Sequence, residues 1–322
     1  MKYYISVFLG AMSYGILSTI VVLAYGQGFQ LSEVVGSQLL MGFTLSWILA
    51  VIVKMKEMHT RRNRTSSELA AEAKAALTWK QRIVLMLAGI STVATSLVYY
   101  GSLHYNSASL AVVFLFQFTW MTMVMQAVSS RQKPTRIMVL SLVILLVGTV
   151  VAAGILEQGA ADLTMPGIVL GLLSAVTYTL FVFFNGKAVP GANPAYRSAW
   201  MITGGFIALC VIYPPYFLFD NFFGGKLILF GFLLGFFGAF IPPLLYAVGV
   251  PHIGESMAGI LGAVELPVAV LMSALVLHEQ ISLLRWVGVV IILCGVLFPK
   301  LLELNRTKSA SRAKSTISSL SK

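Results

Sequence analysis

Glu265 and Pro267 lie two positions apart in AVELPVAVL (263–271), a segment that is otherwise apolar. A carboxylate can take up a proton or bind an ammonium group. A proline removes one backbone N–H donor and opens a helix near the fourth residue before it, here Ala263. The surroundings of this segment decide whether these two groups belong to a site.

The composition indicates that the surroundings are lipid. Of 322 residues, 58% are hydrophobic and 10% are charged, with a mean hydropathy of +0.89, whereas soluble domains carry about 25% charged residues. We therefore expect an all-α polytopic membrane protein with ten transmembrane helices, because ten apolar runs approach the roughly 20 residues that a span needs. They lie at 4–24, 34–53, 83–103, 108–128, 137–156, 167–184, 195–218, 227–248, 256–277 and 283–302.

The basic residues set the expected orientation. If Met1 is inside, all but two of the 22 Lys and Arg residues fall on the same side, the exceptions being Lys226 and Arg285. Cytoplasmic loops carry the excess of Lys and Arg, so we expect both termini in the cytoplasm and the protein in the cell (plasma or inner) membrane. The charge of +11 is spread over these loops, which favours membrane lipid as a partner and argues against nucleic acid.

In this setting Glu265 lies near the centre of the ninth span. A charged side chain at that depth costs roughly 2.5–3.5 kcal/mol or more, and protonating a glutamate at pH 7 costs about 3.7 kcal/mol. Since the two costs are comparable, a small change in water access could switch the proton on or off. The alternative is a protonated side chain that only packs against a neighbouring helix.

The chain repeats itself at an offset of 147 residues. Tyr99 falls on Tyr246, and VILLVG, which ends at Gly148, falls on VIILCG, which ends at Gly295. Five helices per half is an odd number, so the second half enters the membrane inverted, as in many secondary transporters. The expected units are a first repeat at 1–160 with a cytoplasmic loop at 55–81, a second repeat at 161–303, and a basic cytoplasmic tail at 304–322.

The repeat adds candidates in the fourth span. Gln117 lies one position away from the image of Glu265, and Trp120 is the image of Pro267. Both are candidates for a substrate or proton pathway. For Pro267 two roles stay open, a structural kink and a gating hinge.

The chain resembles the ten-helix, EamA-like branch of the drug/metabolite transporter superfamily over nearly its whole length. The most specific part is ELPVAVLMSALVLHEQISLLRWVGVVIILCGV (265–296), with the family's proline at Pro267, turn glutamate at Glu279, and a glycine-bearing tenth helix. The usual glycine before the turn glutamate is His278 here. The resemblance implies transport without a fixed cargo. It also implies that four tyrosines lie in helices that line the central cavity, where they could bind a ligand or only pack: Tyr14, Tyr99, Tyr178 and Tyr246.

Other classes of protein lack support in the sequence. A GxxxxGK[ST] loop is absent, and the four histidines and two cysteines have no metal-ligand spacing. We expect no catalytic residues, no metal and no other cofactor, and therefore no enzyme.

The predicted function is secondary active transport, in the export direction, of a small organic metabolite such as an amino acid. The carrier would alternate access to a midplane site at Glu265, with proton coupling as one energy source. A facilitated-diffusion uniporter or a channel is the alternative, and a non-transporting membrane scaffold is a remote one. Association into a homo-oligomer stays open.

Overall fold

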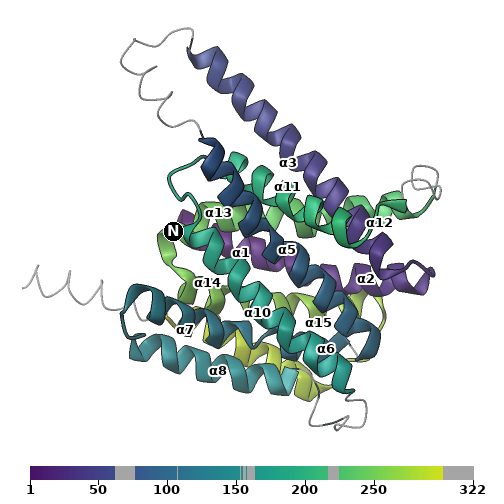
Figure 1. The fold of residues 1–322 in the computed structure, drawn as a ribbon. Coiled ribbons are helices and arrows are strands. Elements are labelled where there is room, and N and C mark those ends of the chain that lie inside the picture. Colours follow the sequence, from purple (N-terminus) through teal and green to yellow (C-terminus); the bar gives the residue numbers. More distant parts are fainter. Residues whose placement is uncertain are drawn as a thin grey trace, which may run out of the picture.

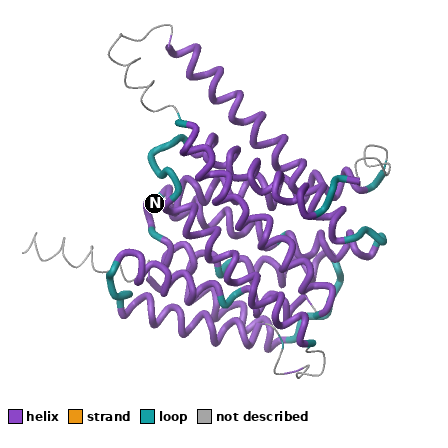
Figure 2. Tube along the Cα trace, in the orientation of Figure 1, coloured by secondary structure: helices purple, strands orange, loops and turns teal. Residues whose placement is uncertain are grey.

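The computed structural model describes residues 1–61, 77–106, 108–152, 154, 157, 164–216 and 225–299. Helices and short connecting loops make up this part of the chain, in which no strand occurs (Figure 2). Eight helices are long and apolar enough to span a membrane, and two shorter apolar helices, Arg136–Ala152 and Leu283–Pro299, complete ten. The prediction of an all-α protein with ten membrane helices is therefore confirmed.

The first half contributes five spans. The first is α1 (Lys2–Gly15) with α2 (Leu17–Gly26), the second α3 (Leu31–Arg61), the third α5 (Trp79–Tyr105), the fourth α6 (Ala108–Leu115) with α7 (Phe118–Ser130), and the fifth α8 (Arg136–Ala152).

The second half contributes five more. The sixth is α10 (Met165–Lys187) and the seventh α11 (Pro194–Ile212). The eighth is α12 (Leu227–Leu234), which continues through a wider π-helical turn, η2 (Gly235–Phe240), into α13 (Ile241–Ile253). The ninth is α14 (Glu255–Gly262) with α15 (Glu265–Val276), and the tenth is the helix Leu283–Pro299.

α3 continues to Arg61, into the segment predicted as a cytoplasmic loop at 55–81. No glycine or proline interrupts KMKEMHTR, and Lys, Met and Glu are good helix formers, so the helix runs on and projects from the bundle (Figure 1). The next helix begins at Trp79, where Thr78 and Gln81 form a capping box. The rest of the loop and the predicted tail at 304–322 lie outside the described residues.

The two halves pack in an exchanged pattern. The first span, as α1, lies against α13 of the eighth, and the sixth span, α10, lies against α5 of the third. Likewise the second span packs against the eighth, and the seventh against the third. Each contact maps onto another when the halves are exchanged, as an inverted repeat requires.

The two ends of the bundle collect the segments that ten alternating spans predict. At one end Tyr3 stacks on His252 with ring centroids 3.7 Å apart, and Figure 1 shows the N-terminus close to α13 and α14. At the other end Asn106 contacts Thr164, and Lys226 donates to Gln27 at 2.8 Å. Segments that follow an odd number of spans thus lie opposite the N-terminal end.

Glycines permit the close crossings between spans. A Cβ at Gly171 would lie 2.6 Å from the Cβ of Phe114, and one at Gly235 would lie 2.5 Å from the Cβ of Met41. Small residues of this kind let membrane helices approach closely. Large apolar side chains cover the outward faces, as Val128 and Leu275 do with 71% and 64% of their surface exposed, which suits contact with lipid.

Candidate functional site

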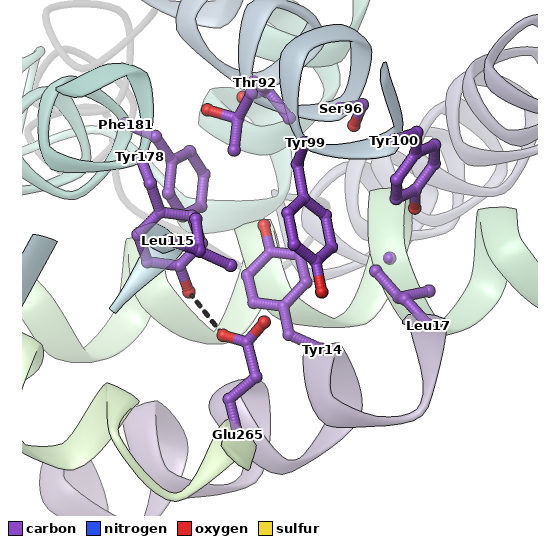
Figure 3. A pocket seen from close by; sticks show the side chains of 12 residues that line it. Tyr14, Leu17, Thr92, Ser96, Tyr99, Tyr100, Leu115, Tyr178, Phe181 and Glu265 are labelled. Atoms are coloured by element: carbon purple, nitrogen blue, oxygen red, sulfur yellow. Dashed lines mark hydrogen bonds between the residues drawn. The ribbon is translucent and has the colours of Figure 1, made fainter. Parts of the chain in front are cut away.

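A cavity lies between the halves, near the middle of the spans. Its volume is about 30 Å³, enough for about two water molecules, since one needs roughly 10–15 Å³. A metabolite does not fit without movement of the helices. The cavity is lined by Tyr14, Leu17, Thr92, Thr95, Ser96, Tyr99, Tyr100, Leu115, Tyr178, Phe181, Gly238 and Glu265 (Figure 3).

Glu265 is the first residue of α15 and is 7% exposed. It follows two turn residues, Ala263 and Val264, whose N–H groups bond the third residue before them and tighten the helix at this depth. A carboxylate in the first turn of a helix is stabilised by the positive end of the helix dipole, typically by about 0.3–1 kcal/mol. The interruption thus places the acid at a helix start inside the membrane, and interrupted membrane helices recur at the binding sites of carriers.

A tyrosine hydroxyl donates a hydrogen bond to the acid. The Tyr178 hydroxyl donates to Glu265 Oε2 at 3.5 Å and lies 3.2 Å from the Tyr246 hydroxyl. Figure 3 shows the carboxylate directed at Tyr178, with the Tyr14 ring beside it. Tyr178 thus links the ninth span to the sixth and, through Tyr246, to the eighth.

Aromatic rings surround the carboxylate. The ring centroids of Tyr14 and Tyr178 are 5.6 Å apart, and those of Tyr14 and Tyr246 are 6.1 Å apart, both edge to face. The ring centroid of Phe118 lies 4.4 Å from that of Tyr178, and the ring centroid of Phe181 lies 5.5 Å from that of Tyr246. Aromatic rings in such arrangements attract cations over their faces. The site can therefore exchange a proton or hold an organic cation.

Polar contacts close the N-terminal end of the bundle below this cluster. Arg197 is fully buried and donates to the carbonyls of Asn185, Ala188 and Ala247. These contacts join the sixth, seventh and eighth spans. Lys187 pairs with the buried Glu255 at 3.7 Å. The Thr and Ser hydroxyls that line the cavity lie on α5, from its midpoint at Thr92 to Ser96.

The model of the EamA-like transporter family matches residues 165–299. The second half of the chain is therefore similar to the EamA-like transporter family. The match runs from the start of α10 to the end of the tenth helix, and it confirms the resemblance to the drug/metabolite transporter superfamily. The family places the protein among multi-pass membrane transporters of the drug/metabolite type.

A solved crystal structure of another protein aligns with the whole bundle, including the half that the EamA match does not cover. The TM-score is 0.66 over 92% of this chain and 99% of the other, with 14% of residues identical. This likeness shows a shared fold. No curated protein matches the chain.

The structure brings most of the candidate residues to one place. Tyr14, Tyr99, Tyr178 and Glu265 line the cavity, and Tyr246 lies directly behind Tyr178, fully buried. All four tyrosines were expected because the EamA resemblance places their helices around a cavity. Their roles in transport stay predictions.

Gln117 and Trp120 are not brought to the cavity. The Trp120 indole donates to Gln117 Oε1 at 3.0 Å, and Trp120 is 38% exposed. The true image of Glu265 is Phe118, which takes the buried position. Pro267 is buried in the first turn of α15, where a proline is tolerated. The structure thus offers no cavity role for Gln117 or Trp120.

Sequence reasoning missed the hydroxyl-bearing wall of α5. Thr92, Thr95 and Ser96, followed by Tyr99, recur at the spacing of one helical face. This polar stripe within an apolar span was the available signal. Among the described residues, no group of three His, Cys, Asp or Glu side chains could hold a metal ion.

Proposed function

We propose that this protein is a secondary active carrier that exports a small organic metabolite with an amino group, such as an amino acid, in exchange for protons. The observation that carries the proposal is the buried Glu265 carboxylate, which faces a cavity between two inverted halves. We place the protein in the plasma or inner membrane with both termini in the cytoplasm, because its basic residues gather on that side.

The proposed cycle uses one carboxylate for two ligands. Glu265 binds either a proton or the ammonium group of the substrate, so release of one permits binding of the other. Tyr178 donates to the ionised carboxylate, and the rings of Tyr14, Tyr178 and Tyr246 hold the cation in its place. Net exchange then follows without a second acidic group.

Alternating access follows from the exchanged packing of the halves. Contacts at the N-terminal end, including those of Arg197 and Glu255, close one route to Glu265. An opposite packing would release them and close the other end. When the substrate is a monovalent cation, the charges of the exchange cancel, and each pH unit across the membrane contributes about 1.4 kcal/mol. This supports roughly tenfold accumulation per pH unit.

Proteoliposomes test the proposal. Vesicles containing wild type or Glu265→Gln, and vesicles without protein, receive radiolabelled leucine or isoamylamine under a pH gradient, with a pH-sensitive dye inside. We expect saturable wild-type uptake coupled to proton release, and uptake by Glu265→Gln no faster than in protein-free vesicles. Glu33→Gln is the matched control, because this carboxylate accepts from the Gln30 N–H at the start of α3 and does not line the cavity.

Each other outcome contradicts the proposal in a specific way. Saturable uptake without proton movement would indicate facilitated diffusion. Uptake that rises linearly with solute concentration would indicate a channel. Proton-coupled uptake by Glu265→Gln at the wild-type rate would remove the role of the carboxylate.

A further inference from the structure

The Thr92 hydroxyl is a buried polar group that the proposed cycle leaves unused. Thr92 lines the cavity and is 6% exposed, and its Oγ1 has no hydrogen-bond partner within the described part of the chain. A buried hydroxyl without a partner costs roughly 1–3 kcal/mol, so such a group calls for a ligand or water that uses it.

The Tyr100 hydroxyl on α5 also lines the cavity without a hydrogen-bond partner in the described part of the chain, whereas the Ser and Thr neighbours of Thr92 bond their own helix. Thr95 donates to the Ser91 carbonyl at 2.8 Å, and Ser91 donates to the Ala88 carbonyl at 2.6 Å. Ser and Thr in helices usually satisfy themselves in this way. Thr92 does not, and Ser96 lies one turn further along the same face. Figure 3 shows both across the cavity from Glu265, with the rings of Tyr14 and Tyr99 between them.

The charge of the cavity lining limits what a second subsite can bind. Glu265 supplies one negative charge, and no Lys, Arg or His is among the lining residues that the structure describes. Arg197, though buried, donates to carbonyls at the N-terminal end. An ammonium group at Glu265 leaves the cavity neutral. A substrate carboxylate would add a buried charge without a cation, which costs several kcal/mol.

We infer that Thr92, with Ser96 beside it, forms a second subsite that binds a neutral hydrogen-bonding group, a hydroxyl or a carboxamide, of an amine held at Glu265. The inference rests on the proposed function and narrows its substrate class to amines without a carboxylate, which excludes the free amino acid given there as an example. Amino alcohols and amino-acid amides fit both subsites. A simple amine leaves Thr92 unpaired, and a zwitterionic amino acid leaves its carboxylate without a counter-charge.

A matched series of ligands isolates the second group. Leucinol, leucinamide, leucine and isoamylamine share one ammonium group and one branched chain, and they differ only in the substituent that would meet Thr92. The cavity must widen to admit any of them, and this cost is common to the series. Ratios of affinity within the series therefore report the subsite.

Isothermal titration calorimetry on the purified full-length protein measures these ratios. We expect leucinol and leucinamide to bind about three- to tenfold more tightly than isoamylamine, the worth of one hydrogen bond. We also expect leucinol and leucinamide to bind at least about tenfold more tightly than leucine, because the carboxylate of leucine would be buried without a counter-charge.

Variants assign the effect to the hydroxyl. In Thr92→Val, leucinol affinity falls about three- to tenfold, to the level of isoamylamine, while isoamylamine binds as before. Thr92→Ser retains the preference for leucinol. Thr149→Val is the matched control, since its buried hydroxyl bonds the Leu145 carbonyl on α8. Valine has the shape of threonine and removes an unpaired hydroxyl, so the thermal midpoint of Thr92→Val is unchanged or higher.

The outcomes separate this inference from the proposed function. If all four ligands bind equally and Glu265→Gln abolishes binding, the second subsite is wrong and the role of Glu265 stands. If Glu265→Gln binds them like wild type, the proposed function fails as well. If leucine binds as tightly as leucinol, or Thr92→Val weakens all four alike, the inference is overturned. Failure of all four to bind also overturns it.

Discussion

The fourth and ninth spans are interrupted in the same way, yet they present different chemistry. In the fourth, the N–H groups of Gln117 and Thr119 bond the carbonyls three residues earlier. In the ninth, the image residues Val264 and Leu266 do the same. The residue at the start of the second segment is Phe118 in one span and Glu265 in the other, and both are buried beside Tyr178.

The third and eighth spans show the complementary difference. On α5 the cavity meets Thr92 and Ser96, whereas their images in the eighth span are Ala239 and Pro243. The acid thus comes from the second half and the hydroxyls from the first. The comparison teaches that the interrupted helix belongs to the repeated fold, while Glu265, Thr92 and Ser96 each occur in one half alone.

The largest expected effect comes from making the two interrupted spans alike. Glu265→Phe gives the ninth span the residue of the fourth, and we expect transport in proteoliposomes to fall to the level of protein-free vesicles, a loss of at least about tenfold, or 1.4 kcal/mol. The fold should persist, because replacing a buried ionisable group by a packed apolar one is often neutral or stabilising. Thermal unfolding of the purified variant checks this.

Phe118→Leu is the matched control at the image position. It keeps an apolar side chain there, so we expect transport within about threefold of wild type and a loss of stability below about 1.5 kcal/mol. If Glu265→Phe unfolds while Phe118→Leu stays folded, the carboxylate holds the helix interruption together. The separation between fold and chemistry would then be wrong.

A second, smaller effect tests the repeated packing. The crossing of the third and seventh spans brings Gly204 against the Met86 carbonyl, and its image, the crossing of the eighth and second spans, brings Gly235 against Met41. We expect Gly204→Val and Gly235→Val each to lower the free energy of unfolding by about 1–3 kcal/mol, measured by thermal unfolding in detergent.

Gly191→Ala is the control for these glycines, because no atom lies within 4 Å of a Cβ at that position. Its thermal midpoint should match that of wild type. If one of the two valine variants is as stable as this control, the two crossings are not equivalent, and the packing of the halves is less symmetric than their contacts indicate.

Much of this architecture could be predicted from the sequence. The ten apolar runs matched the helices because lipid requires long apolar segments whose backbone bonds are internal. Glu265 stood out because an ionisable side chain inside a membrane span is costly and usually has a functional role. The end of α3 at Arg61 was not predicted, since apolar content marks where lipid ends and says little about where a helix ends.

The rest depended on three-dimensional packing. Thr92 and Thr95 are alike in the sequence, and only the structure shows which hydroxyl bonds its own helix and which faces the cavity without a partner.

Trp120 was placed by analogy with Pro267. However, the first span is interrupted at Ile16 and its segment α2 packs against α15, whereas α10 is continuous. The two image positions therefore have different neighbours.

The smallest expected effect concerns Pro267 itself. Because the fourth span is interrupted with Trp120 at the image position, the proline is not needed for the interruption. We expect Pro267→Ala to keep kcat and KM for proton-coupled leucine or isoamylamine uptake within about threefold of wild type. We expect the free energy of unfolding to change by less than about 1 kcal/mol, since a proline in the first turn of a helix removes no essential bond.

A hinge would behave differently, because hinge variants change kcat and KM together. A joint loss of more than about tenfold in a variant of wild-type stability would assign gating to this proline and distinguish the ninth span from the fourth in motion as well as in chemistry.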